Sequence, residues 1–119
     1  MPMLDFDSGT KVYLACGTTD LRKGFEGLKL IIKLNFKLDP YSKSMFVFCN
    51  RTRTVLKILQ WDGSGLWLFI KRLDHGRFLW LSNADEVKLI SVKQLHWILQ
   101  GLSLEQKNAF KDRHPTLII

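Results

Sequence analysis

The segment Asp62-Gly63-Ser64-Gly65 constrains the fold most, because it places a short polar turn between two apolar runs. The run 54–61 precedes the turn, and the run 66–73 follows it. Glycine adopts the positive φ angles of tight hairpin turns at little steric cost. The pattern therefore predicts a β-hairpin, and a chain that contains it must build a sheet around it.

Other strand-like runs lie on both sides of this hairpin. Residues 45–49 are rich in Phe and Val, and the segment 74–76 turns the chain into a run over 77–81. Short strands joined by tight turns predict an antiparallel meander between residues 45 and 81. Two further short strands are expected over 11–16 and 87–90.

An amphipathic helix is expected over 21–36, where apolar residues recur at helical spacing. The preceding Thr18-Thr19-Asp20 offers side chains that can cap its start. Gly24 and Gly27 each weaken a helix by roughly 1 kcal/mol relative to Ala. We therefore expect the first turns to be irregular or very closely packed.

The C-terminal part is predicted to be helical. Ser91 is placed to cap a helix over 92–100 that ends at Gly101, and the segment 103–119 is expected to contain a final helix over 104–113 and a tail. A chain of 119 residues suits one domain, spanning 1–119. The predicted fold is α+β: a small antiparallel sheet with helices on one face or at one end.

The charge balance favours an anionic partner. Lys and Arg total 18 against 11 acidic residues, which gives a formal net charge of +7. Such an excess lowers the cost of approaching phosphates. A basic surface that is only solvated by water would give the same net charge. The grouping of the basic residues must therefore decide between these two interpretations.

Metal, cofactor and membrane signals are weak. Cys16 and Cys49 lie in apolar runs and are expected to be buried free thiols, and the three histidines have no ligand spacing. We expect no metal site and no cofactor. No apolar run approaches the ~20 residues of a membrane span, and no signal-peptide pattern opens the sequence. The expected location is the cytoplasm.

No catalytic residues are predicted. Carboxylates such as Asp20, Asp62 and Asp74 each have an ordinary capping or turn role. A two-metal nuclease requires carboxylates that converge on ions ~3.5–4 Å apart, and no nucleotide-binding motif is present. A nuclease-like enzyme is therefore the weakest of the functional hypotheses.

Basic residues on successive strands and turns are the candidate nucleic-acid-binding residues. They are Arg51, Arg53, Lys57, Lys71, Arg72 and Arg77. A meander would gather them into one positive surface, provided that the strand register does not send neighbours to opposite faces. Secondary candidates are Arg22, Lys23, Trp67 and Trp80. The tryptophans have two open explanations, stacking on bases or packing in the core.

Several sequence blocks resemble one known family, the TnpB accessory proteins of insertion-sequence-66 elements, which are unrelated to the RNA-guided nuclease of the same name. The matching blocks cover roughly residues 11 to 102 and are Val12–Gly17, Thr19–Leu28, Phe46–Arg51, Leu56–Gly65 with Trp67, and Lys71–Phe78. The TDxRKGF and WDGxGxWL patterns among them are long enough to be specific. One departure is Leu81, where the family usually has proline.

The resemblance implies a non-catalytic accessory protein that assists DNA transposition beside a separate DDE-type transposase. Its molecular role has two open alternatives. The leading hypothesis is binding to DNA at the element ends, or to the transposase complex, through the basic cluster. The alternative is a protein–protein adaptor that docks on the transposase without contacting DNA.

Overall fold

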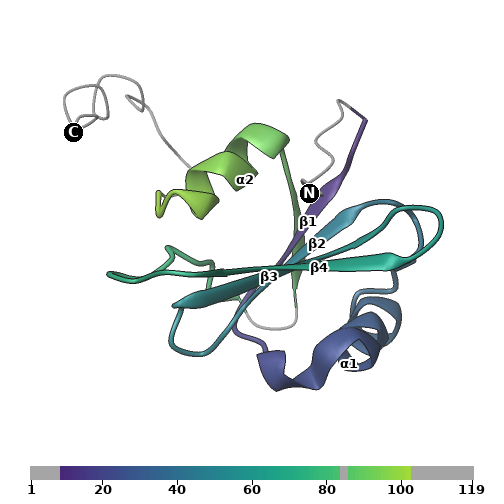
Figure 1. Ribbon diagram of the computed structural model, residues 1–119, viewed down its shortest axis with the longest axis horizontal. Coiled ribbons are helices and arrows are strands. Elements are labelled where there is room, and N and C mark those ends of the chain that lie inside the picture. The colour runs from purple at the N-terminus through teal and green to yellow at the C-terminus, as the bar shows by residue number, and fades with distance from the viewer. Residues whose placement is uncertain (1–8, 84–85, 103–119) are drawn as a thin grey trace.

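The computed structural model describes residues 9–83 and 86–102, which form a sheet with helices on both sides (Figure 1). The helical elements are the 3-10 turn η1 (Leu21–Lys23), α1 (Gly24–Leu30), the π-helical turn η2 (Ile31–Asn35) and α2 (Val92–Leu99). The strands are β1 (Val12–Ala15), β2 (Met45–Cys49), β3 (Val55–Trp61), β4 (Leu66–Arg72) and β5 (Val87–Ile90). No helix in these described ranges is long and apolar enough to cross a membrane.

The sheet has the strand order β4-β3-β2-β1-β5. β2, β3 and β4 form the expected antiparallel meander, and the hairpin at 62–65 is confirmed by its closing bond from Asp62 N–H to the Gly65 carbonyl (3.0 Å). β1, however, runs parallel to β2, so the α+β class is confirmed but the sheet is mixed. The reason is the helical segment η1-α1-η2, which returns the chain to the end of the sheet where β1 began.

The helices lie on opposite faces of the sheet, which corrects the expectation of one face or one end. Leu95 and Ile98 of α2 pack over one face, and Leu28 of α1 packs over the other. β2 separates these two cores: Val47 points toward α2, and Phe46 points toward α1. All five residues of β2 are buried, as expected for a strand covered on both faces.

The predicted strand over 77–81 is wrong. This segment leaves the end of β4 and crosses the α2 side of the sheet to reach β5. Its backbone makes isolated hydrogen bonds and not a strand ladder. Phe78 N–H donates to the Arg53 carbonyl (2.7 Å), and Gly17 N–H donates to the Leu81 carbonyl (2.7 Å). The apolar residues that suggested a strand, Phe78 and Trp80, instead fill the core beneath α2.

The predicted helix ends are confirmed where the structure describes them. The Asp20 side chain accepts a bond from Arg22 N–H at the start of η1, and Ser91 and Gln94 form a complete capping box on α2. Gly101 has φ +80°, with bonds from Gly101 N–H to the Ile98 carbonyl and from Leu102 N–H to the Trp97 carbonyl. These two bonds form a Schellman motif. The expected helix over 104–113 and the tail lie outside the described residues.

The two glycines of the first helix explain its irregular start. Gly24 has φ +67° and separates η1 from α1. A Cβ on Gly27 would lie 2.3 Å from the Cβ of Lys23, far inside van der Waals contact. The expected close packing is therefore present, and it is between one helical turn and the next.

We predict that Gly27→Ala destabilises the protein by about 1–3 kcal/mol, because the turn must shift to admit the new methyl group. In an unconstrained helix the same change stabilises by about 1 kcal/mol. Urea unfolding measures the difference. Gly65→Ala is the matched control, since a Cβ there meets open space. A Gly27→Ala protein as stable as wild type would contradict the steric account.

Candidate nucleic-acid interface

One end of the sheet, where β2 ends, β3 begins and β4 ends, collects most of the candidate basic residues. The turn 50–54 at this end is organised by Asn50, whose Oδ1 accepts bonds from the N–H groups of Thr54 and Val55 (both 3.0 Å). Arg53 in this turn has φ +62°. The turn thus holds Arg51 and Arg53 on a defined backbone.

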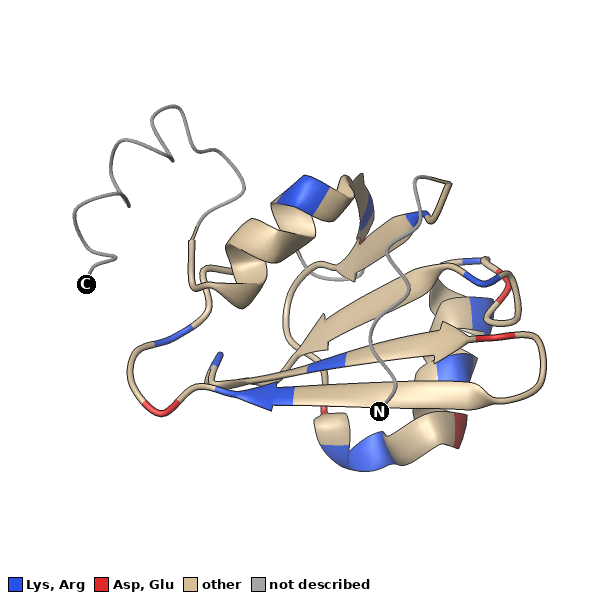
Figure 2. Cartoon of the chain, turned by 45° about the horizontal axis from the view of Figure 1, so that its top comes forward, with Lys and Arg blue, Asp and Glu red and all other residues tan. Residues whose placement is uncertain are grey.

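Main-chain bonds fix the neighbouring segments against this turn. Leu73 N–H donates to the Thr54 carbonyl (2.9 Å), and Phe78 N–H donates to the Arg53 carbonyl (2.7 Å). The end of β4 and the loop after it therefore lie beside the turn, and they bring Arg72 and Arg77 with them. We call this region the basic end of the sheet; Figure 2 shows the basic residues on the end of β4 and in the adjacent loop.

The register divides Lys71 from Arg72. Lys71 pairs with Leu56, which belongs to the core under α2, so its side chain lies on the α2 face. Its Nζ donates to the Leu99 carbonyl at the end of α2. Arg72 pairs with Val55, which packs against the core under α1. Adjacent residues of a strand point to opposite faces of the sheet, so the side chains of Lys71 and Arg72 cannot lie on the same face.

Lys57 lies on the α1 face of the sheet. It alternates with Leu56 and Ile58, which face α2, and its Nζ donates to the Leu21 carbonyl at 2.7 Å. The six candidates therefore share one end of the sheet but not one face. The register divides the expected positive surface, because Lys57 and Arg72 lie on the α1 face and Lys71 lies on the α2 face.

The six candidate cations have no carboxylate partner within the described residues. Ion pairs in those ranges join Arg22 to Asp20 (2.9 Å) and Lys29 to Glu26 (3.0 Å). The basic end therefore keeps its positive charge, although Asp74 lies in the same loop. Unpaired guanidinium groups at one end of a sheet are suited to phosphate oxygens.

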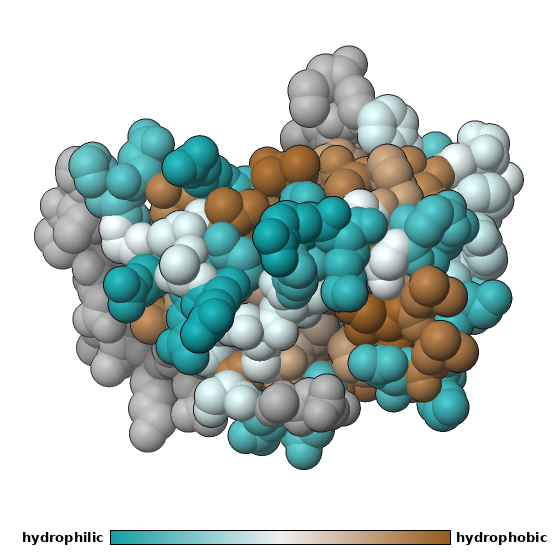
Figure 3. Space-filling view, turned by 90° about the horizontal axis from the view of Figure 1, so that it is seen from below, coloured by the Kyte–Doolittle hydropathy of each residue, from teal (hydrophilic) through white to brown (hydrophobic). Residues whose placement is uncertain are grey.

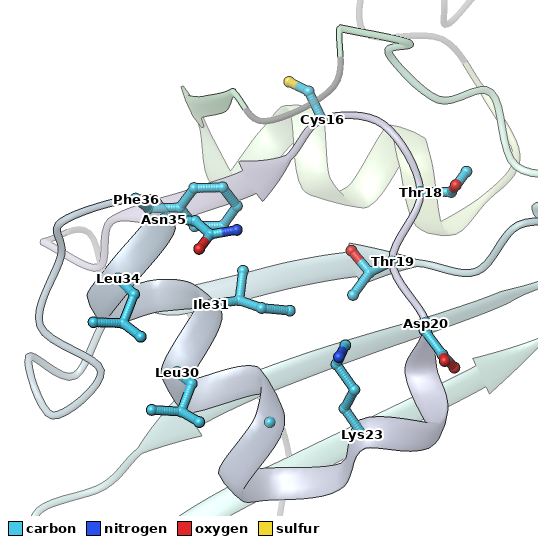
Figure 4. Close-up of a pocket in the computed structure, with 11 residues that line it drawn as sticks. Cys16, Thr18, Thr19, Asp20, Lys23, Leu30, Ile31, Leu34, Asn35 and Phe36 are labelled. Carbon is cyan, nitrogen blue, oxygen red and sulfur yellow. The ribbon is translucent and has the colours of Figure 1, made fainter.

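Of the secondary basic candidates, Arg22 already has an anion. Its guanidinium holds the Asp20 carboxylate through two bonds of 2.9 Å, and this contact holds the pKa of Asp20 well below its usual range. Lys23 lies instead along a groove of about 400 Å³ beside α1 and η2, where Figure 4 shows its amine near Thr19 and Ile31. Exposed Leu30 and Leu34 form the outer part of that groove.

Trp80 is not available for stacking on a base. It is 8% exposed, and its indole N–H donates to the Ala15 carbonyl at 3.0 Å. Trp67 is 39% exposed and stacks on Phe69 with ring centroids 5.9 Å apart. The core explanation holds for Trp80, whereas Trp67 keeps an accessible ring.

Sequence reasoning missed a hollow of about 580 Å³ between the end of β1, the turn 50–54 and Lys57. Its polar lining includes the hydroxyl residues Thr18, Thr19 and Thr52 beside Arg51. The TDxRKGF block supplies Thr19 to this hollow, but the parallel pairing of β1 and β2 that brings the walls together had no signal in the sequence. Parallel strands bring their carboxyl ends, and the loops that follow, to the same edge.

Cys16 lines the groove beside α1, and Cys49 is the last residue of β2. Both are buried free thiols, and burial raises the pKa of Cys49 to about 11 and raises that of Cys16. In the parts of the chain that the structure describes, no three His, Cys, Asp or Glu side chains gather as metal ligands.

A family model described as "IS66 Orf2 like protein" matches residues 10–109. The chain belongs to this family. It is therefore an accessory protein associated with insertion sequences, as the resemblance implied.

Two relatives come from Sinorhizobium fredii (strain NBRC 101917 / NGR234), and both are described as uncharacterized. Protein y4hO is 41% identical over 100 residues, covering 84% of this chain and 87% of the relative. Protein y4jC is 27% identical over 116 residues, covering 98% of this chain and 99% of the relative. No solved structure matches the chain. The family match thus gives a biological context, and the molecular role must be inferred from the geometry of the site.

The WDGSGLW segment of this IS66 Orf2-like protein is a structural turn. One oxygen of Asp62 accepts bonds from the N–H groups of Ser64 (2.8 Å) and Gly65 (2.9 Å), and the other accepts the Trp67 indole N–H (2.7 Å). These backbone bonds, with the indole bond, lower the pKa of Asp62 from 3.8 to about 2. The carboxylate is occupied by the turn.

We predict that Asp62→Asn destabilises the hairpin at neutral pH, because an amide cannot offer acceptors to all of these donors. A folded-state pKa below the unfolded value means that the stabilisation is present above about pH 4 and is lost as the pH falls toward about 2. Urea unfolding at pH 7, 4 and 2.5 should show the difference between variant and wild type shrinking. Asp74→Asn is the control, and a difference independent of pH would count against the carboxylate.

We also predict that the purified protein does not cleave DNA in Mg²⁺ or Mn²⁺. The carboxylates of Asp20 and Asp62 are held by Arg22 and by the hairpin turn, respectively. The assay is incubation with supercoiled plasmid followed by electrophoresis. Cleavage that disappears when a single Asp is changed to Asn would overturn this prediction.

Proposed function

We propose that this IS66 Orf2-like protein assists transposition by binding the DNA backbone at the basic end of the sheet. The observation that carries the proposal is the convergence of Arg51, Arg53, Arg72 and Arg77 on one end of the sheet, held there by main-chain bonds. None of them has a carboxylate partner among the residues that the structure describes. The element ends are the DNA that such a protein would meet.

The energetics of this contact come from counterion release. Each phosphate neutralised on duplex DNA contributes about −0.9 to the slope of log K against log salt. Guanidinium groups on turns at a sheet end can reach phosphates, but they carry no base readout by themselves. The proposed role is therefore positioning on DNA with little sequence preference.

Lys57 and Lys71 take a different part in this binding. The Lys57 amine donates to the Leu21 carbonyl and the Lys71 amine donates to the Leu99 carbonyl, and these bonds restrain the positions of both side chains. They extend the positive potential from the sheet end onto the α1 face and the α2 face. A DNA strand bound at the basic end can thus contact positive side chains on both the α1 face and the α2 face.

An adaptor that docks on the transposase is the second candidate function. Exposed leucines on the α1 side favour it, since Leu30 is 54% and Leu34 is 60% exposed beside the groove that holds Lys23. Figure 3, which views the molecule from below, shows hydrophobic surface among the hydrophilic side chains. An apolar partner segment with an acidic residue would fit such a groove.

We predict that Arg72→Gln combined with Arg77→Gln weakens binding to any duplex about 60-fold at 0.1 M salt and lowers the salt slope by about 2, since two phosphate contacts are lost. Fluorescence anisotropy over a salt series with a mixed-sequence duplex measures both quantities. Circular dichroism and thermal unfolding report whether the variant remains folded.

The matched control removes the same charge elsewhere. Lys33 and Lys88 lie on η2 and β5, away from the basic end, and both are exposed. Lys33→Gln combined with Lys88→Gln should change the affinity far less. Equal losses in the two double variants would show that net charge alone matters, and absence of DNA binding by the wild type would favour the adaptor.

A further inference from the structure

The hollow at the carboxyl ends of β1 and β2 has the features of an anion site. We propose that it is a phosphate-binding subsite; this assignment rests on the proposed function, because it names the DNA group that the hollow would hold. The volume of about 580 Å³ is ample for one phosphate and its neighbouring sugars. Leu21 and Val55 supply apolar lining, and the polar lining residues are Thr18, Thr19, Asp20, Arg22, Asn50, Arg51, Thr52 and Lys57.

Main-chain contacts hold the walls of the hollow together. Thr19 N–H donates to the Cys49 carbonyl at 2.8 Å, which joins the loop after β1 to the end of β2. Figure 4 shows Thr18 and Thr19 on this loop, before the chain enters η1 at Asp20. The opposite wall is the turn 50–54, which Asn50 fixes. A subsite whose walls are tied by backbone bonds loses little entropy when a ligand enters.

Lys57 contributes a positive charge to the lining of the hollow. Its side chain is partly buried, and its amine donates to the Leu21 carbonyl at 2.7 Å. An ammonium group has three donors, and within the described residues this carbonyl is the acceptor it contacts. Two N–H groups are therefore left for a ligand. Because the partner is a neutral carbonyl, the positive charge is oriented without being neutralised.

The charge balance of the lining selects an anion. Asp20 is the acidic side chain that lines the hollow, and Arg22 neutralises it through a two-bond ion pair. Lys57 and Arg51 then remain in excess. The hydroxyls of Thr18 and Thr19 add donors to the lining. A phosphate diester carries one negative charge and only acceptor oxygens, so its chemistry complements this set of donors.

The test uses inorganic phosphate and amide chemical shifts of the full chain, at constant ionic strength maintained with chloride. We expect saturable shifts at the amides of Thr18, Thr19 and Thr52. Lys57→Gln, which removes the charge and leaves a shorter polar side chain, should abolish them. Lys88→Gln removes the same charge from β5 at the outer edge of the sheet and should leave them intact. The spectra themselves report that each variant is folded.

A DNA titration separates the two possible sources of phosphate. With a mixed-sequence duplex at 0.1 M salt, Lys57→Gln should bind about eightfold more weakly than Lys88→Gln and lower the salt slope by about 0.9. Unperturbed hollow amides, or equal behaviour of both variants, would overturn the subsite while DNA binding through Arg72 and Arg77 still stood. Saturable phosphate shifts without any DNA binding would assign the hollow to free phosphate and overturn the proposed function instead.

Discussion

The burial of β2 on both faces is the constraint on which the remaining structure depends. A strand covered on both sides needs a helix above and another below, and α2 and α1 supply them. Its parallel pairing with β1 brings the carboxyl ends of both strands to one edge, and the antiparallel return through β3 and β4 brings the arginines there as well. The candidate interface is therefore a consequence of the central strand and its neighbours.

Local features of the fold could be predicted from sequence because their causes lie within a few residues. The Asp62 turn, the Ser91 capping box and the helix end at Gly101 are all of this kind. Strand order and register depend on distant partners. The segment 77–81 has the composition of a strand, yet Phe78 and Trp80 are used to fill a core that the local pattern does not reveal. The division of Lys71 from Arg72 follows from the same cause, since pairing with β3 decides which face each one occupies.

The family blocks separate into residues that maintain the backbone and residues that remain available. The Asp62 carboxylate accepts the bonds that close the hairpin, and Gly27 leaves no room for a Cβ beside Lys23. Arg51, Arg72 and Arg77 have no comparable structural role in the described contacts. A sequence pattern alone does not distinguish these two groups of residues. The list of candidate interface residues could therefore be shortened only when the contacts of each side chain were known. The hollow beside Lys57 required the parallel pair, which no local pattern predicted.

The position of β4 as an outer strand gives its terminal charges a consequence for solubility. An outer strand presents a row of backbone groups that can pair with another chain, and exposed Ile70 (60%) makes that edge more adhesive. Lys71 and Arg72 at the end of β4 repel an identical strand that approaches in register. β5, the other outer strand, is short and carries Lys88. The positive charge at the end of β4 thus disfavours edge-to-edge pairing between copies of the chain.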